Sequence, residues 1–281
     1  MKIVRTISEV RQYVKEWRSQ GLTVGLVPTM GYLHEGHQSL IAAAVKGNDR
    51  VVVSVFVNPK QFGPAEDLAS YPRDLEKDAA LCEATGAHLL FHPEPSEMYP
   101  QGHCAFADVE ELGKVLCGKT RPIHFRGVCT VIVKLANIVM PDRMYFGQKD
   151  AQQLTIVRRL ARDLNMPVEI VGCPIVRETD GLAKSSRNAY LNPEERRAAV
   201  ILSRAIAAGK ATAQNGTVTP DEIREIMLRT LAEEPAANVE YVEIVDSQTL
   251  LPVDNLNGPI LVAIAVRIGK TRLIDNFTLP E

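Results

Sequence analysis

One segment of this chain is an almost unbroken run of apolar, mostly β-branched residues, Val51-Val52-Val53-Ser54-Val55-Phe56-Val57. A strand with one face in water alternates apolar and polar residues, whereas a strand covered on both faces reads as a continuous apolar run. The run is therefore typical of an interior strand of a parallel sheet. Because parallel neighbours need long crossover connections, usually helices, this segment favours an α/β fold.

The rest of the first two thirds of the chain repeats this alternation. Shorter runs predict further strands at 22–27, 87–91, 144–146 and 168–171. Helical patterns separate them and end near residues 21, 46, 85, 140 and 164, and the pattern that ends near 140 begins at Val128. A stretch rich in proline and glycine, 93–105, is expected to be a long loop. The sequence therefore predicts a doubly wound parallel sheet with helices on both faces over residues 1–177.

The pattern changes near Asn192-Pro193, where strands no longer alternate with helices. Two helices are expected, the first over 194–213 and the second capped by Thr219, with a turn at Asn215-Gly216 between them. Short strands follow near 239–245, 260–267 and 271–277. We assign residues 178–281 to a smaller α+β domain. Because it lacks clustered reactive side chains, its expected role is a lid or platform across a nucleotide site.

Two histidines three positions apart, His34 and His37, lie just after the strand at 22–27. Pro28 and Gly31 are expected to bend the chain after the strand, and a helical pattern begins beyond His37. The segment therefore predicts a strand, a glycine-bearing loop and a helix N-terminus. Backbone N–H groups and the helix dipole favour anions there, and two imidazoles one turn apart can donate to the same phosphate chain. A zinc pair is the alternative, but metalloproteases space their histidines four apart and no third ligand lies nearby. Ordinary surface or core histidines are the structural alternative.

Two further polar segments also follow predicted strands: Asn58-Pro59-Lys60-Gln61-Phe62 and Gly147-Gln148-Lys149-Asp150. Since ligands of such sheets bind beyond the carboxyl ends of the strands, we expect one composite site there. Lys149 can reach phosphate and Asp150 can accept hydrogen bonds from ribose, although a Lys-Asp pair alone is commonly a solvated helix start. Asn58 and Gln61 offer neutral amides that suit a small polar acid.

A loop at 180–188 combines two hydroxyls with the cations Lys184 and Arg187, which suits a departing pyrophosphate. The alternative is an interdomain linker with an N-capping serine. Asp78, near Asp74 and Glu76, is a candidate Mg²⁺ ligand, against the alternative of a solvated helical carboxylate.

The net charge of −2 gives no general basic field for nucleic acid, so an anionic substrate must be held by local cations. Five scattered cysteines without a C-x-x-C motif indicate reduced thiols in a cytoplasm. Neither a signal-peptide core nor an apolar run of membrane-spanning length is present, so a soluble, cytoplasmic protein without a membrane partner is expected.

Together these segments resemble the pantothenate synthetase (pantoate–β-alanine ligase) family of the HIGH-motif nucleotidyltransferase superfamily. The matching segments are Pro28 to His37, Phe56 to Phe62, Tyr71-Pro72-Arg73, His124 to Val128, Phe146 to Gln153, and Asp180 to Asn188. The resemblance implies a Rossmann-like fold and an ATP-dependent ligase of vitamin B5 and coenzyme A biosynthesis. Such an enzyme converts (R)-pantoate and ATP into pantoyl adenylate and pyrophosphate. The amine of β-alanine then attacks the adenylate to give pantothenate and AMP.

The resemblance also implies roles for individual residues. Catalytic roles fall on His34, His37, Lys149 and Arg187. Pantoate would contact Gln61 and Gln153, and β-alanine would contact Gln61 and Asn58. The implied ATP contacts are Met30, Gly31, Tyr32, Leu33, His34, Glu35, Gly36, His37, Gly147, Gln148, Lys149, Asp150, Val176, Lys184, Ser185, Ser186 and Arg187. The family further implies Mg²⁺ dependence, a homodimer and a mobile C-terminal lid.

This chain departs from the family pattern at Lys184, Ile123 and Cys117, where methionine or another apolar residue, glycine and glutamate are usual. Three rival functions stay open. A nucleotidyltransferase acting on a phosphorylated acceptor would need cations where Asn58 and Gln61 are neutral. A synthetase-like fragment that binds tRNA would need a basic stripe. A nucleotide sensor would not need to keep all the cations that face the phosphates.

Overall fold

The computed structural model describes residues 1–64, 66–214 and 218–280, which form two compact units. The N-terminal unit consists of Met1–Lys114, Gly118–Gln148 and Ile156–Pro174, and the C-terminal unit of Val115–Cys117, Lys149–Thr155 and Ile175–Glu281. The predicted turn at Asn215-Gly216 lies outside the described residues.

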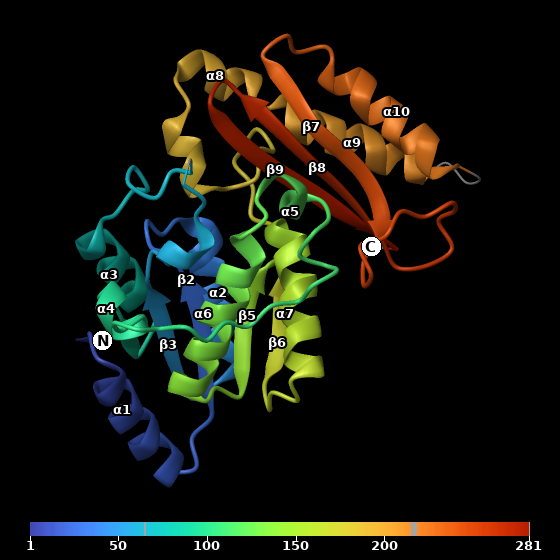
Figure 1. Cartoon of the computed structure of the whole chain (residues 1–281). Coiled ribbons are helices and arrows are strands. Elements are labelled where there is room, and N and C mark those ends of the chain that lie inside the picture. Colours follow the sequence, from blue (N-terminus) through green and yellow to red (C-terminus); the bar gives the residue numbers. More distant parts are fainter. Residues whose placement is uncertain (65, 215–217, 281) are drawn as a thin grey trace. The chain divides into compact units, whose positions relative to one another are not determined.

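The N-terminal unit is built on a six-stranded sheet with the order β1-β4-β3-β2-β5-β6, in which the paired strands are parallel (Figure 1). The strands are β1 (Lys2–Val4), β2 (Val24–Thr29), β3 (Arg50–Val55), β4 (Leu89–Phe91), β5 (Arg143–Gly147) and β6 (Glu169–Cys173). This sheet confirms the predicted α/β architecture. The chain runs from β2 outward through β3 and β4, and then resumes on the other side of β2 with β5 and β6. Strand order thus reverses between β2 and β5, and open α/β sheets bind ligands at such a reversal.

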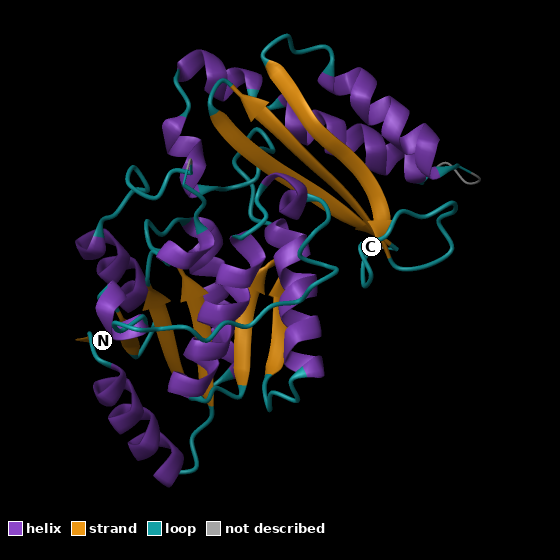
Figure 2. Cartoon of the chain, viewed as in Figure 1, coloured by secondary structure: helices purple, strands orange, loops and turns teal. Residues whose placement is uncertain are grey.

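Helices alternate with these strands (Figure 2). They are α1 (Ile7–Ser19), α2 (Glu35–Gly47), α3 (Leu75–Ala84), α4 (Pro95–Met98), α5 (Cys117–Thr120), α6 (His124–Val139) and α7 (Ala151–Asp163). Two 3₁₀ turns, η1 (Pro59–Gln61) and η2 (Gln148–Asp150), follow β3 and β5. Val51, Val52 and Val53 of β3 are fully buried, as the continuous apolar run predicts.

Three local predictions differ from the structure. β2 continues through Pro28, where a bend is expected from sequence; its pairing with β5 ends at Leu26, so the missing proline N–H interrupts no ladder on that side. α6 begins at His124 rather than Val128. The stretch 93–105, predicted to be a loop, contains α4.

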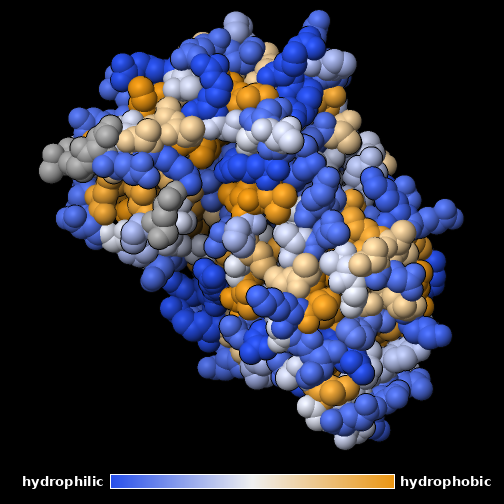
Figure 3. Space-filling view, turned by 180° about the vertical axis from the view of Figure 1, so that it is seen from behind, coloured by the Kyte–Doolittle hydropathy of each residue, from blue (hydrophilic) through white to orange (hydrophobic). Residues whose placement is uncertain are grey.

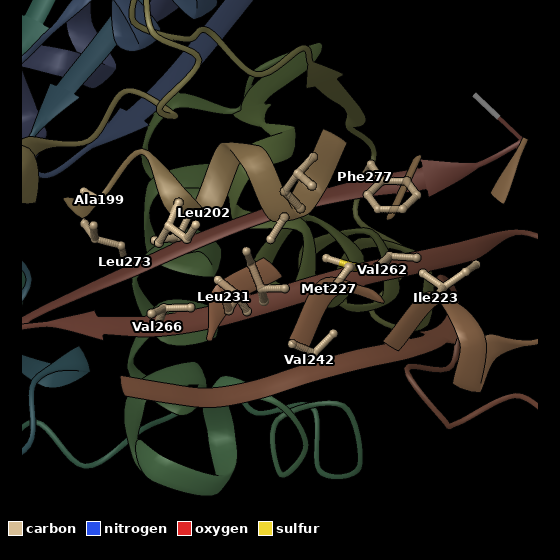
Figure 4. Close-up of a cluster of buried hydrophobic side chains, with 14 of the residues drawn as sticks. Ala199, Leu202, Ile223, Met227, Leu231, Val242, Val262, Val266, Leu273 and Phe277 are labelled. Atoms are coloured by element: carbon tan, nitrogen blue, oxygen red, sulfur yellow. The ribbon is translucent and has the colours of Figure 1, made fainter. Parts of the chain in front are cut away.

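The C-terminal unit is a three-stranded antiparallel sheet, β7-β8-β9, packed with helices. Its elements are η3 (Ser186–Tyr190), α8 (Pro193–Ala198), α9 (Ile201–Ala213), α10 (Pro220–Leu231), β7 (Ala237–Asp246), β8 (Ile260–Ile268) and β9 (Thr271–Leu279). Figure 4 shows its core, where Leu202, Met227 and Leu231 of the helices meet Val262 and Phe277 of the sheet. The predicted α+β fold of this smaller part is therefore confirmed, and its boundary at residue 178 stays a prediction. The helix predicted over 194–213 is in fact two helices, α8 and α9, and no glycine or proline marks the junction.

Hydrophilic residues cover much of the face drawn in Figure 3, with apolar residues scattered among them. Across the described ranges, every helix is too short or too polar to cross a bilayer.

Candidate active site

The histidine loop joins β2 to α2 and requires two residues in the left-handed region, Gly31 (φ 87°) and Tyr32 (φ 53°). His34 is the N-cap of α2, and its Nδ1 accepts a hydrogen bond from the Gly36 N–H at 3.1 Å. His37 reaches back, so that its Nδ1 accepts from the His34 N–H at 3.3 Å. The ring centroids of the two histidines lie 4.1 Å apart. The imidazoles thus form a reciprocal capping box in which both side chains satisfy the backbone of the first turn.

This arrangement fixes how the two histidines present their protons. A neutral imidazole has one donor and one acceptor nitrogen, so a ring whose Nδ1 accepts carries its proton on Nε2. His34 and His37 therefore each hold an Nε2–H donor at the N-terminus of a 13-residue helix, where the dipole is positive. Adjacent donors at a positive helix end can bind the oxygens of a phosphate chain.

Asp78 of α3 holds the histidine loop in place. Its Oδ2 accepts from the Tyr32 N–H at 2.8 Å and its Oδ1 from the Leu33 N–H at 2.6 Å, and the residue is 1% exposed. Burial raises the pKa of this carboxyl above its ordinary value, although the two amide donors favour its ionised form. Both oxygens are thus engaged by the backbone of the loop, while the assignment of Asp78 as a Mg²⁺ ligand stays a prediction.

A second cluster of neutral groups lies at η1, after β3. Asn58 Nδ2 donates to Gln61 Oε1 at 2.9 Å and to the Gly127 carbonyl of α6 at 3.0 Å. Gln61 Nε2 lies 3.0 Å from Met30 Sδ, which connects this cluster to the histidine loop. Tyr99, which sequence reasoning missed, donates its hydroxyl to Asn58 Oδ1 at 2.7 Å. Asn58 and Gln61 are only 1% and 6% exposed, so the cluster is a pre-ordered array of amides.

The C-terminal unit contains the segment around Lys149. η2 leads into α7, and the Lys149 carbonyl accepts a hydrogen bond from Asn276 Nδ2 on β9 at 2.8 Å. Gln152 is buried and fixes the chain at 115–117, since its Oε1 accepts from the Cys117 N–H and its Nε2 donates to the Val115 carbonyl. Lys149 and Gln153 are half-buried, and Asp150 is exposed.

The predicted phosphate loop begins as a hairpin, residues 176–184, in the C-terminal unit. The Lys184 N–H donates to the Val176 carbonyl at 2.9 Å, and Gly181 turns the chain with φ 90°. Lys184 Nζ forms an ion pair with Glu178 Oε2 at 2.8 Å, so this lysine has a carboxylate partner. Ser185 caps η3 by accepting from the Arg187 N–H at 3.3 Å, which confirms the N-capping serine of the structural alternative.

The departures Cys117 and Ile123 occupy different environments. Cys117 is buried in the C-terminal unit, with its Sγ 3.2 Å from the Tyr241 hydroxyl and 3.5 Å from Arg272 Nη2. Burial is the main cause of the raised pKa of the Tyr241 hydroxyl. Ile123 precedes α6 and is 45% exposed.

Each unit thus brings together part of the predicted set. Met30 to His37, Asn58, Gln61 and Asp78 belong to the N-terminal unit, as do Gly147 and Gln148. Lys149, Asp150, Gln153, Val176 and Lys184 to Arg187 belong to the C-terminal unit. Sequence reasoning missed Asp275 and Asn276 of β9, whose signal is a pair of polar residues between the apolar residues Ile274 and Phe277.

The sheet is parallel, and its strand order reverses between β2 and β5. At that reversal a glycine-bearing loop leads into a capped helix. These two features define a nucleotide-binding protein of the Rossmann-like class. Comparison with known families is more specific, because the family model for pantoate-beta-alanine ligase matches residues 2–278. The chain belongs to this family. It is therefore an enzyme, a ligase that joins pantoate to β-alanine.

The similarity to individual relatives extends over the whole chain. Pantothenate synthetase from Ruminiclostridium cellulolyticum is 59% identical over 278 residues, 99% of each chain. The crystal structure of pantothenate synthetase from Thermus thermophilus is similar with a TM-score of 0.94 at 46% identity, again over 99% of each chain. The ligase from Francisella tularensis, solved in complex with beta-gamma ATP and β-alanine, has a TM-score of 0.80 at 32% identity, over 99% of this chain and 97% of that one.

Proposed function

We propose that this ligase activates (R)-pantoate as its adenylate at the expense of ATP and then transfers the pantoyl group to β-alanine. The observation that carries the proposal is the reciprocal capping of α2, which gives His34 and His37 each an Nε2–H donor at the loop where strand order reverses. The Francisella relative, bound to an ATP compound and β-alanine, supports the same choice of substrates.

The two steps follow from the chemistry of a carboxylate, which is a poor electrophile. One pantoate carboxylate oxygen attacks the α-phosphorus of ATP, and the bond from that phosphorus to the bridging oxygen breaks to release pyrophosphate. The amine of β-alanine then attacks the acyl carbon and loses a proton. AMP leaves with the oxygen that pantoate had contributed. Catalysis consists mainly of positioning and of stabilising charge on the phosphates.

The proposed roles of the cationic and hydrogen-bonding groups follow from this charge. Nε2–H of His34 and His37 donates to phosphate oxygens, with His37 as the proton donor toward the leaving pyrophosphate. Lys149 and Arg187 neutralise charge as it builds on phosphate during the reaction. Asp150 binds the ribose, and the remaining ATP contacts are those that the family resemblance implies, including the HIGH-type segment 30–37.

Pantoate and β-alanine would be held by amides rather than by cations. Gln61 and Gln153 are proposed to bind pantoate, and Gln61 and Asn58 to bind β-alanine. A neutral pocket orients the pantoate carboxylate without neutralising it, so that the oxygen stays nucleophilic. The buried Asn58–Gln61 hydrogen bond supports this proposal because it aligns both amides before substrate arrives.

Mg²⁺ is proposed to arrive with ATP, as part of the substrate. Within residues 1–64, 66–214 and 218–280, no three His, Cys, Asp or Glu side chains group into a metal site, and both oxygens of Asp78 accept backbone N–H groups. Mg²⁺ commonly keeps its waters and binds substrate phosphates. We further propose a homodimer in the cytoplasm, with residues 1–177 binding nucleotide and pantoate and residues 178–281 acting as a lid. All five cysteines lie within the described residues and none is in a disulfide there, which supports a reducing compartment.

The decisive experiment follows one oxygen atom. The enzyme is first incubated with MgATP and pantoate labelled with ¹⁸O in its carboxylate, without β-alanine. We expect pyrophosphate and an acyl adenylate by mass spectrometry. Addition of β-alanine should then release AMP that carries one ¹⁸O from pantoate. Formation of ADP, or AMP without the label, refutes the adenylate route, as would transfer of the nucleotidyl group to a phosphorylated acceptor.

A further inference from the structure

Two adjacent residues of β9 hold two segments that the proposed function assigns to ATP. Asp275 and Asn276 are 1% and 5% exposed and stand in a strand whose other buried residues, apart from Thr271, are apolar. Because successive side chains of a strand point to opposite faces, the two residues reach different parts of the C-terminal unit. Neither residue belongs to any nucleotide segment.

Asn276 fixes the backbone of the Lys149 segment. Its Nδ2 donates to the Lys149 carbonyl at 2.8 Å, within the single turn η2 that precedes α7. A 3₁₀ turn has few internal hydrogen bonds, so an external donor restricts the direction in which the lysine side chain leaves the chain. Because this hydrogen bond is to the main-chain carbonyl, it does not engage the Lys149 ammonium, which is proposed to bind phosphate.

Asp275 fixes the hairpin 176–184, which leads into η3 and Arg187. The Arg177 guanidinium donates to Asp275 Oδ2 at 2.7 Å and to Oδ1 at 2.9 Å, a bidentate pair. The same guanidinium donates to the Gly181 carbonyl at 2.9 Å, so the ion pair links one strand of the hairpin to its turn. The Asp275 carboxylate is buried on the same face of β9 as Leu273 and Phe277. It needs such a partner, because an unpaired buried charge is strongly destabilising.

We propose that Asp275 and Asn276 are positioning residues that set the Lys149 segment and the Arg187 loop at a fixed spacing, and so align both cations with one triphosphate. This inference rests on the proposed function, since it presumes that Lys149 and Arg187 bind ATP. Consecutive Cα atoms of a strand are about 3.8 Å apart, so the spacing between the two attachment points is set by a single peptide unit. β9 thus contributes to adenylate formation without touching substrate.

The first test uses Asn276→Ala, with Thr230→Val as a matched control. Thr230 also makes a buried hydrogen bond to a main-chain carbonyl, that of Ile226 within α10, but touches no nucleotide segment. Pantoate-dependent exchange of pyrophosphate into ATP measures the first step alone. For Asn276→Ala we expect kcat of exchange to fall about tenfold, with KM for ATP changed by less than about threefold. Thr230→Val should match the wild type in both.

A second variant separates positioning from stability. Arg177→Met combined with Asp275→Leu replaces the ion pair by apolar side chains, a change that commonly preserves or raises stability. We expect a melting temperature near that of the wild type together with slow exchange. Exchange at the wild-type rate in this variant, or a loss in Asn276→Ala no larger than in Thr230→Val, overturns the proposal. Absence of exchange in the wild type would instead refute the proposed function itself.

Discussion

Gly127 of α6 sits where any side chain would collide with the amide cluster. A Cβ built there lies 2.2 Å from the Lys60 carbonyl oxygen and 2.5 Å from the Gln61 Cα, and both atoms belong to the main chain of η1. Main-chain atoms cannot swing aside as a flexible side chain can. The Gly127→Ala variant must therefore move η1 by about 1 Å to restore van der Waals distance.

The expected effect follows from the residues that η1 carries. Overpacking of this kind lowers the free energy of unfolding by about 1–3 kcal/mol. A displacement of about 1 Å at Gln61 is expected to lower kcat/KM for pantoate by about a hundredfold. Because the histidine loop carries its own anchor at Asp78, KM for ATP should change little.

Steady-state kinetics with each substrate varied in turn test this prediction, and urea unfolding measures the stability. Gly258→Ala is the matched control, because a Cβ at Gly258 has no atom within 4 Å and the residue does not adopt a positive φ. Wild-type kcat/KM for pantoate in Gly127→Ala would refute the reasoning. An equal loss in Gly258→Ala would also refute it.

Three further predictions address charge and thiol chemistry. Burial opposes ionisation of the Glu66 carboxyl, but the Arg121 guanidinium, the Gly63 N–H and His124 together lower its pKa below the ordinary 4.5. The stabilisation that the ionised carboxylate provides is therefore present above pH 4.5 and is lost as the pH falls through the lowered pKa. Glu66→Gln should therefore be less stable than the wild type by about 1 kcal/mol at pH 7, and this difference should shrink as the pH falls below 4.5 in urea titrations. A difference independent of pH contradicts this. Native protein should react rapidly with a thiol reagent at Cys104 alone. Cys104 is exposed, whereas burial raises the pKa of other thiols, among them that of Cys82 to about 12. Rapid labelling of several thiols before unfolding contradicts this prediction. Lys149→Ala should slow pantoate-dependent pyrophosphate exchange at least about a hundredfold with an unchanged circular dichroism spectrum, and near-normal exchange would remove Lys149 from the site.

Local sequence patterns were sufficient to predict the architecture. The apolar run at Val51–Val57 predicts burial on both faces, because consecutive residues of a strand point to opposite faces. The order of the strands could not be predicted in this way, because it depends on which elements pack together across long separations in the sequence. The reversal between β2 and β5 therefore emerges only in the folded sheet.

The candidate site likewise has one part that the sequence predicts and one part that it does not. The histidine pair and the polar segments after β3 and β5 can be recognised from spacing alone. The partners that hold them are distant in sequence: Asp78 lies more than forty positions from the loop it anchors, and Asn276 lies 127 positions from Lys149. No pattern in a single sequence couples such pairs. The break between α8 and α9 was unpredictable for another reason, because no glycine or proline marks it.

The capping histidines have a consequence for how mutants of this loop are interpreted. His34 and His37 each accept a backbone N–H, so replacing either one removes a helix cap worth about 1 kcal/mol along with its Nε2–H donor. A kinetic defect in His34→Ala therefore mixes a frayed α2 with a missing donor. Asparagine can accept the same N–H but is shorter, so comparing His34→Asn with His34→Ala separates the two contributions. Ligand-free melting curves for both variants are needed before any rate is assigned to the imidazole.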